Sequence, residues 1–359
     1  AAVAVLVVTC PCALSLATPT AMLSTAGVLA RQGVLVRRLQ AIEAMAEVDT
    51  VVFDKTGTLT EARLGLGAAV TRAGMSEAGA LALAAALARH SLHPVSRALV
   101  AAATAPAAWS VSPELMLSDL TEQAGQGMQG LLAEPLESAS PGPIRMGSAR
   151  FCGIEDAPPS DRTKVFLADA TGWLARFELD EVLRPDAADA VRRLQAAGLA
   201  VHMLSGDHLT AAQRVAEGLG IAQVQGNCTP QSKLAWLQTL QSQGRKVLMV
   251  GDGLNDAPVL ARANVSVAVG QAVPLAQAQS DFIIPGGQLG RLARMPVQAR
   301  RTLRIVKQNL LWAAAYNLVC VPLAISAYLP AWLAGLGMAL SSLLVLANAA
   351  RLTRAQESD

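Results

Sequence analysis

The fold is decided by one stretch, residues 51–60, which reads Val-Val-Phe-Asp-Lys-Thr-Gly-Thr-Leu-Thr. Its first three residues are apolar and suit a strand that is buried on both faces. The polar run that begins at Asp54 would then lie at the carboxyl end of the strand, where open α/β sheets place their ligands. An aspartate followed by Lys55, Thr56 and Thr58 is a candidate nucleophile, because carboxylates can form aspartyl-phosphate intermediates. The alternative is an ordinary turn in which Asp54 is a solvated cap.

Two later apolar segments end in similar polar turns. Residues 200–204 precede Ser-Gly-Asp, and residues 246–250 precede Gly-Asp-Gly-Leu-Asn-Asp. Further elements are expected to alternate along the chain, with strands at 265–269 and 282–284 and helices at 185–197, 210–219 and 231–241. This alternation predicts a doubly wound parallel sheet of the α/β class. The three polar turns should therefore converge on one crevice.

The predicted crevice would hold several carboxylates together with a hydroxyl and an amide. The groups concerned are Asp54, Ser205, Asp207, Asp252, Asn255 and Asp256. Clustered carboxylates repel one another unless a cation neutralises them, and Mg²⁺, which prefers oxygen ligands, is the natural choice. Lys233, which precedes the third of these strands, would supply a positive charge for phosphoryl oxygens.

The composition indicates a membrane protein rather than an ordinary soluble enzyme. The chain has 359 residues, of which 52% are hydrophobic and only 16% are charged. Its formal net charge is +2, so no nucleic-acid partner is expected. The five cysteines are sparse and imply no disulfide framework. The sequence starts without Met inside an apolar run, and we therefore expect it to be a C-terminal fragment of a longer chain.

Both ends of the chain carry runs without charge. Residues 1–30 contain no charged side chain, and neither do residues 308–350. The first run exceeds the roughly 20 residues needed to cross a bilayer, and the second suffices for two helices with Pro330 near the turn. Basic residues flank both runs, which marks these flanks as cytoplasmic. The alternative is a set of buried helices in a large soluble protein.

The first apolar run contains Cys10-Pro11-Cys12. Residues two apart on a regular helix point about 200° apart, but proline removes a backbone hydrogen bond and kinks the helix. Such a distortion could bring both sulfurs toward one ion. Thiolates select soft metals such as Cu(I) or the softer divalent ions. The alternative is a pair of packed cysteines beside a helix kink.

In its Asp-Lys-Thr-Gly-Thr and Gly-Asp-Gly-Leu-Asn-Asp turns the chain resembles the P-type ATPases, which are cation pumps with a haloacid dehalogenase-like phosphorylation domain. The resemblance implies that ATP phosphorylates Asp54. It also implies that Asp54, Asp252 and the Thr56 carbonyl bind Mg²⁺, while Ser205 and Lys233 hold the phosphoryl group. The remaining implied members of the catalytic site are Lys55, Thr58, Gly206, Asp207, Asn255 and Asp256.

By the same resemblance, an α+β nucleotide-binding domain is inserted after the first strand. His93-Pro94 resembles the His-Pro motif of the heavy-metal subgroup, whose histidine contacts adenine. Gly125 and Gly127 open a segment that resembles the Gly-rich nucleotide loop of that subgroup, and Gly147 belongs to the same expected ATP site. Glycines let a backbone approach a ligand closely.

Two positions depart from the usual pattern of that subgroup. Leu92 stands where a glutamate is frequent, and Ser148 stands where an asparagine is frequent. The contacts to ATP are therefore not expected to follow the best-known members residue by residue.

The terminal helices bear on the identity of the metal. Tyr316-Asn317, and later Met338, Ser341 and Ser342, resemble the Tyr-Asn and Met-x-x-Ser-Ser patterns of the copper(I) pumps. Pumps for zinc, cadmium or lead carry a lysine and an aspartate in these helices, and this hairpin has neither. The alternative roles are polar contacts between membrane helices and, for Met338, core packing.

Five segments are predicted from these observations. They are a transmembrane helix at 1–30, the phosphorylation domain at 31–63 and 179–300, the nucleotide-binding domain at 64–178, and a transmembrane hairpin with a short tail at 301–359.

The leading hypothesis is an ATP-driven pump that exports Cu(I), or Ag(I), from the cytosol across the cell (inner) membrane. Its expected partners are membrane lipid, the upstream actuator domain and earlier helices of the same pump, and a copper chaperone. One alternative is a pump for Zn²⁺ or Cd²⁺. Two others are a soluble dehalogenase-like phosphatase or phosphotransferase, and a membrane metal sensor that has lost catalysis. The intact set of Asp54, Thr56, Lys233, Asp252 and Asn255 argues against the sensor.

Overall fold

The computed structural model describes residues 5–6, 12–104, 115, 117–155, 162–252, 256–270, 274–326 and 328–354. The contacts divide the chain into two units. The first unit is Ala1–Thr58 with Pro185–Asp359, and the second is Leu59–Arg184. One unit is thus an insertion into the other, and the predicted boundaries at 64 and 178 stay a prediction.

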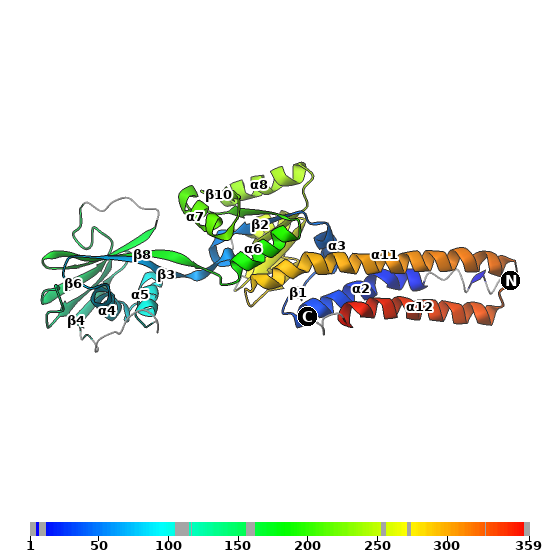
Figure 1. Ribbon diagram of the computed structural model, residues 1–359, viewed down its shortest axis with the longest axis horizontal. Helices are drawn as coiled ribbons and strands as arrows, with labels where there is room; N and C mark the ends of the chain where they lie inside the picture. Colours follow the sequence, from blue (N-terminus) through cyan, green and yellow to red (C-terminus); the bar gives the residue numbers. More distant parts are fainter. Residues whose placement is uncertain are drawn as a thin grey trace. The chain divides into compact units, whose positions relative to one another are not determined.

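A parallel sheet forms the centre of the first unit (Figure 1). Its strand order is β1-β13-β12-β11-β2-β9-β10. The strands are β1 (Leu35–Val36), β2 (Thr50–Asp54), β9 (Ala200–Leu204), β10 (Gln223–Gln225), β11 (Val247–Gly251), β12 (Val265–Val269) and β13 (Phe282–Ile284). All described pairings are parallel except that of β1 with β13. The predicted doubly wound sheet is confirmed.

The central strand β2 is buried along its whole length. It pairs with β9 on one side, where Asp54 lies opposite Leu204, and with β11 on the other, where Phe53 lies opposite Val250. The three polar turns therefore leave the sheet at the same edge, as the sequence predicted.

Helices connect the strands of this sheet. They are α3 (Gln40–Glu47), α6 (Ala187–Ala196), α7 (Leu209–Leu219), α8 (Pro230–Ser242), α9 (Ala257–Arg262) and α10 (Pro274–Gln279). Helix α8 begins where its sequence directs, because Thr229 accepts a hydrogen bond from the Ser232 amide at 3.1 Å and Pro230 occupies the first turn. Leu237 and Leu240 then anchor α8 in the core beside β11.

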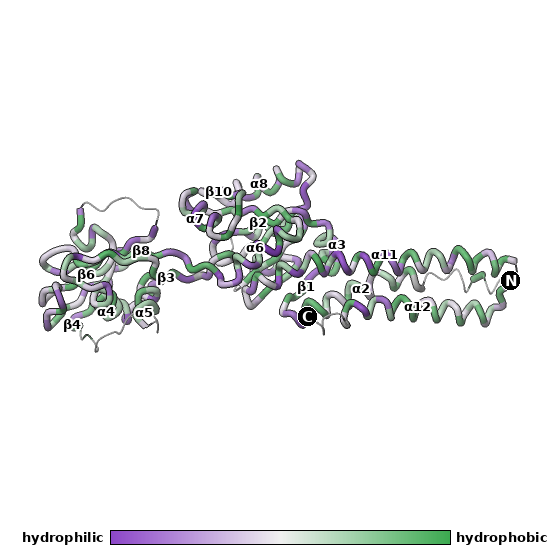
Figure 2. The backbone as a smooth tube through the Cα atoms, viewed as in Figure 1, coloured by the Kyte–Doolittle hydropathy of each residue, from purple (hydrophilic) through white to green (hydrophobic). Residues whose placement is uncertain are grey.

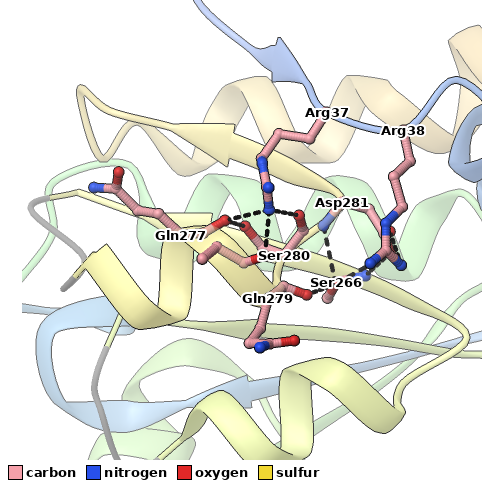
Figure 3. A network of polar contacts seen from close by, with 8 residues as sticks. Arg37, Arg38, Ser266, Gln277, Gln279, Ser280 and Asp281 are labelled. Carbon is pink, nitrogen blue, oxygen red and sulfur yellow. Dashed lines mark hydrogen bonds and ion pairs between the residues drawn. The ribbon is translucent and has the colours of Figure 1, made fainter.

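Two arginines, Arg37 and Arg38, directly follow β1, the antiparallel edge strand that pairs with β13 (Figure 3). The Arg37 guanidinium donates to the carbonyls of Gln277 at 2.8 Å and Ser280 at 3.0 Å, at the end of α10. Arg38 lies 3.5 Å from the Asp281 carboxylate. Cations favour the carboxyl end of a helix, so these contacts attach the segment after the first apolar helix to α10 and β13.

Three apolar helices complete the first unit: α2 (Cys12–Arg31), α11 (Leu289–Ile325) and α12 (Ala331–Arg354). Figure 2 shows hydrophobic residues prevailing along α12 and the C-terminal part of α11. Helix α2 packs against both, and a buried hydrogen bond of 2.6 Å joins the hydroxyls of Thr25 and Thr302. Among the described residues, α11 and α12 are long and apolar enough to cross a membrane. Pro330 precedes α12 directly, as expected for the turn.

Helix α11 starts earlier than the sequence indicates. The charge-free run begins at residue 308, but the helix begins at Leu289 and continues without a break through Pro296 and Pro322. The buried residues Leu292 and Met295 lie in its polar first part. One continuous helix therefore joins the region of the parallel sheet to the apolar hairpin.

The second unit is a six-stranded antiparallel sheet with two helices (Figure 1). Its order is β3 (Thr60–Thr71), β8 (Gly172–Leu183), β7 (Thr163–Asp169), β6 (Gly142–Gly147), β5 (Gly127–Leu132) and β4 (Leu117–Gln123). Helices α4 (Glu77–Ala88) and α5 (Pro94–Thr104) pack on this sheet. Their small alanines and leucines share one core with Ile144, Leu167 and Phe177.

Candidate functional site

Three carboxylates meet at the carboxyl edge of the parallel sheet. Oxygens of Asp54, Asp252 and Asp256 lie within 4.8 Å of one another. Asp54 ends β2, Asp252 directly follows β11, and Asp256 precedes α9. The parallel register of β2 and β11 is what brings these distant residues together. Asp54 is only 5% exposed, so the alternative of a solvated cap is wrong.

Lys233 supplies the positive charge of this cluster. Its ammonium donates to Oδ1 of Asp54 and, at 2.8 Å, to Oδ1 of Asp256. The side chain is buried and enters the site from the first turns of α8. A buried charge is tolerated when it is paired and hydrogen-bonded, and Lys233 satisfies this condition with two carboxylates.

The surroundings shift the pKa of both partners. Burial, helped by the charge of Asp256, raises the pKa of Asp54 to about 7, although Lys233 opposes the shift. Burial alone would lower the pKa of Lys233, but Asp54 and Asp256 together raise it above its ordinary value. The lysine therefore stays protonated, while Asp54 needs a further cation before it is fully ionised at neutral pH.

The tight turn at Lys55–Leu59 shapes the space beside Asp54. Gly57 has a φ of +71°, and a Cβ there would overlap the Asp252 carboxylate, so only glycine fits. Lys55 is buried and forms an ion pair with Asp207. This pair ties the turn after β2 to the turn after β9. Thr58 is buried in the turn, whereas Thr56 is exposed.

The turn after β9 is fixed by its backbone. The Ser205 amide donates to the Gln225 carbonyl at 2.9 Å, and its carbonyl accepts from the Cys228 amide at 2.9 Å. The Ser205 hydroxyl accepts from the Asp207 amide at 3.1 Å across Gly206. Ser205 is thus held rigidly at the end of β9. Asn255 lies outside the described residues.

The donor set of the cluster suits a magnesium ion. Three carboxylates within 4.8 Å carry more negative charge than Lys233 offsets. Mg²⁺ takes one or two carboxylates together with water and phosphate oxygens. Asp54 and Asp252 belong to this cluster, as the predicted ligand role requires, and Lys233 contacts both Asp54 and Asp256. When bound, the ion would lower the charge repulsion around an incoming phosphoryl group.

A separate pocket of about 210 Å³ lies in the second unit. Four of the five residues predicted to bind nucleotide line it: His93, Gly125, Gly127 and Gly147. Pro94 instead begins α5. The His-Pro motif and the Gly-rich loop, which are far apart in sequence, are therefore brought to one place.

Two of the glycines that line this pocket allow neighbouring strands to approach closely. A Cβ on Gly127 would overlap the Met146 carbonyl oxygen and lie 2.8 Å from Gly147 Cα. A Cβ on Gly147 would overlap the Gln126 carbonyl oxygen and lie 2.7 Å from Gly127 Cα. The two glycines face each other across β5 and β6, so the strands approach where a larger residue would part them.

The ring of His93 is oriented by its own helix. Its Nδ1 accepts a hydrogen bond from the Val95 amide at 3.3 Å. A neutral ring must then carry its proton on Nε2, which makes Nε2 a donor toward a bound base. The Ser91 hydroxyl accepts the His93 amide at 3.2 Å and so holds the start of the motif.

Sequence reasoning missed two polar residues of this region, Glu122 and Lys164, and gave no role to Ser91. Glu122 and Lys164 line the pocket, and Ser91 joins Glu122 by a hydrogen bond of 3.0 Å. Glu122 precedes the Gly-rich segment by only a few residues, and that proximity was the available signal. Lys164 lies in a different strand, β7, and carried no signal.

The residues predicted to meet transported metal lie on the apolar helices. Tyr316 donates to the Ala334 carbonyl at 3.5 Å, and Ser341 accepts from the Trp312 indole at 3.2 Å. Ser342 donates to the Met338 carbonyl within α12. Asn317 is half-buried on α11. These contacts show polar links between helices, and the metal-binding role stays a prediction.

The other half of the predicted transport site is not described. Cys10 lies outside the described residues, and Cys12 begins α2 with its side chain undescribed. Cys320 is a free cysteine on α11 that no motif used.

Comparison with known proteins agrees with this architecture. The family of haloacid dehalogenase-like hydrolases matches residues 48–264. Nitrogen fixation protein FixI of Rhizobium leguminosarum bv. viciae is 41% identical over 98% of this chain and 44% of its own length. The copper-exporting P-type ATPase of Bacillus subtilis (strain 168) is 33% identical over 98% of this chain and 44% of its own length.

Solved structures show the same relationship. A zinc-transporting PIB-type ATPase in the E2.Pi state superposes with a TM-score of 0.84 and 29% identity, covering 97% of this chain and 57% of that one. The catalytic domain of the CPx-ATPase CopB-B superposes with a TM-score of 0.57 and 27% identity, covering 76% and 98%. The present chain spans about half the length of the curated relatives it matches.

The fold and the buried aspartate cluster define a phosphoryl-transfer domain. The chain belongs to the haloacid dehalogenase-like hydrolases and, within them, to the P-type ATPases. These relatives favour a pump over the alternative of a soluble dehalogenase-like phosphatase or phosphotransferase.

Proposed function

We propose that this chain provides the phosphorylation site, the nucleotide site and part of the transport path of a pump that exports Cu(I) from the cytosol. The observation that carries the proposal is the buried Asp54, held by Lys233 and flanked by Asp252 at the edge of the parallel sheet. ATP bound in the pocket of the second unit would be the phosphoryl donor. Mg²⁺ would be the cofactor.

The proposed chemistry follows from the charges of the site. A carboxylate oxygen of Asp54 attacks the γ-phosphorus of ATP, the bond from that phosphorus to the bridging oxygen breaks, and ADP leaves with the bond electrons. Lys233 offsets charge on Asp54 and on the transferred oxygens. Ser205, which backbone hydrogen bonds hold at the end of β9, would donate its hydroxyl to the phosphoryl group. Water later hydrolyses the aspartyl phosphate.

Three observations favour Cu(I), with Ag(I) as a chemically similar cargo. Several relatives carry the name copper-exporting P-type ATPase. Residues 308–350 contain no charged side chain that would accompany a divalent ion. Tyr316, Met338 and Ser341 lie on α11 and α12, and the thioether of Met338 would suit a soft monovalent metal.

The second candidate is a pump for Zn²⁺ or Cd²⁺. The likeness to a zinc-transporting PIB-type ATPase over 97% of the chain favours it. A metal panel separates the two, since Cu(I) or Ag(I) but not Zn²⁺ or Cd²⁺ should stimulate ATP hydrolysis by the full-length protein. The reverse pattern would establish the divalent pump.

The proposal also concerns the setting of the pump. We expect α11 and α12 to span the cell (inner) membrane among lipids, with both catalytic units in the cytoplasm. An actuator domain and earlier helices of the same pump, together with a copper chaperone, would be its partners. Membrane fractionation and protease protection of α11 in sealed vesicles test this placement.

Phosphoenzyme formation tests the central proposal. Full-length protein with Asp54→Asn should form no acid-stable, hydroxylamine-labile phosphoenzyme from labelled ATP, because an amide cannot replace the attacking carboxylate. The matched control is Asp119→Asn on β4, an exposed residue whose φ of 49° suits asparagine. Labelling that persists in Asp54→Asn would refute the assignment.

A further inference from the structure

One carboxylate of the nucleotide pocket is explained by none of the sequence motifs. Glu122 is the acidic residue among the described residues that line this pocket. It lies on β4 opposite Met128 of β5, so strand pairing fixes its position at the rim. Leu92, which stands where a glutamate is frequent, is 92% exposed and does not line the pocket. The carboxylate at the pocket therefore comes from Glu122 on β4 and not from the position that Leu92 occupies.

The two oxygens of Glu122 have different surroundings. Oε1 accepts a hydrogen bond of 3.0 Å from the Ser91 hydroxyl, which in turn accepts the His93 amide at 3.2 Å. Oε2 makes no hydrogen bond or ion pair within the described part of the chain. One oxygen is thus anchored to the histidine motif, and the other remains available to a ligand.

We propose that Glu122 reads the exocyclic amino group of the nucleotide base and that Ser91 positions it. A carboxylate only accepts hydrogen bonds. It therefore favours a base edge that presents N–H groups and disfavours one that presents a carbonyl oxygen. The neutral His93 ring, whose Nε2 donates, and Glu122, which accepts, offer complementary contacts at one rim. This inference rests on the proposed nucleotide-binding function of the pocket.

ATP and ITP provide the direct comparison, because ITP has a carbonyl where adenine has its amino group. We expect full-length wild-type protein to bind ATP about tenfold more tightly than ITP, the effect of one hydrogen bond to a charged group. Glu122→Ala should abolish this preference. Glu122→Gln should also abolish it, because an amide can donate to the ITP carbonyl as readily as it accepts from the amine.

Two further variants test whether Ser91 positions Glu122 and whether the effect is specific to the pocket. Ser91→Ala should reduce the preference for ATP over ITP without abolishing it, because the carboxylate of Glu122 remains but is no longer held by the hydroxyl. Glu134→Gln, an exposed carboxylate outside the pocket, is the matched control and should leave both affinities unchanged. Dissociation constants from calorimetry and the melting temperature of each variant give the readout.

Each outcome decides the inference. A wild-type protein that binds ATP and ITP equally, or a Glu122→Gln variant that folds and keeps the preference, overturns the role of Glu122 but leaves nucleotide binding intact. A wild-type protein that binds neither nucleotide overturns both this inference and the proposed function. Loss of the preference in both Glu122 variants, with Glu134→Gln unchanged, establishes it.

Discussion

The two sheets of this protein build their sites by opposite means. The parallel sheet gathers buried charges: three carboxylates and Lys233 meet where β2, β11 and α8 converge. The antiparallel sheet depends on small residues: Gly127 and Gly147, which line its pocket, let strands β5 and β6 approach closely. The first site depends on electrostatic balance, whereas the second depends on space. Four substitutions, taken from the largest expected effect to the smallest, probe this difference.

Replacing Lys233 tests the electrostatic side of the comparison. Lys233→Met leaves Asp54 and Asp256 buried beside each other without a counter-charge, which raises the pKa of Asp54 further. We expect the rate of phosphoenzyme formation to fall at least about 100-fold, as when one preorganised donor is lost. Quenched-flow labelling measures it. Lys246→Met, at an exposed lysine, is the control, and a loss of less than about tenfold at Lys233 would argue against its role.

A methyl group added between β5 and β6 tests whether the pocket depends on their close approach. Gly127→Ala places a methyl group against the Met146 carbonyl, which the strand pairing prevents from moving. We expect a stability loss of about 3 kcal/mol and weaker ATP binding. Gly125→Ala is the partner variant, because its added methyl meets open space and costs only the strain of its positive φ. Equal effects of the two on calorimetric ATP affinity would show that the pocket does not depend on the close approach.

Acid stability distinguishes a structural carboxylate from the catalytic ones. Burial would raise the pKa of Asp169, but hydrogen bonds from Ser140 and Thr171 and the charge of Arg72 lower it below its ordinary value. Its stabilising contribution is therefore complete above the ordinary pKa and is lost as the pH falls through the lowered one. Asp169→Asn should cost about 2 kcal/mol at neutral pH.

That variant should also lose less stability on acidification than the wild type. Urea unfolding at about pH 7 and about pH 3 compares the two proteins. A difference between them that does not shrink at the lower pH would contradict the assignment. Phosphoenzyme formation should be unaffected, because Asp169 is not among the residues that line the nucleotide pocket.

The smallest effect concerns the start of α8. Thr229→Ala removes the hydroxyl that accepts the Ser232 amide and should cost about 1 kcal/mol. The charges around Asp54 are untouched, so phosphoenzyme formation should remain close to that of the wild type. Thermal unfolding with labelling measures both. A large catalytic loss would mean that the position of Lys233, and not only its charge, is set by this cap.

Much of the parallel sheet could be predicted from the sequence. Each functional turn directly follows an apolar strand, and the edge where parallel strands end is fixed by topology. The pairing of Lys233 with Asp256 could not be read from spacing, because it depends on the angle at which α8 returns to the sheet. The start of α11 was also hidden, since its polar first half and apolar second half look like separate elements.

The nucleotide pocket was less accessible to prediction for a physical reason. A glycine shows where a side chain is absent, but the sequence does not say which strands close around that space. Glu122 lies in an exposed, polar strand and becomes significant only through its hydrogen bond to Ser91. The rim of this pocket is set by the pairing of β4 with β5 and of β5 with β6, which the sequence alone does not specify.

The two-residue strand β1 attaches the segment that follows α2 to the edge of the parallel sheet. The Arg37 guanidinium donates to the carbonyl of Gln277, which lies 240 residues further along the chain. Only residues 32–34 separate α2 from β1, so a displacement of α2 would reach the edge of the sheet without a long linker. Helix α2 and strand β1 would therefore move together, because the Arg37 guanidinium holds the end of β1 against the carbonyls at the end of α10.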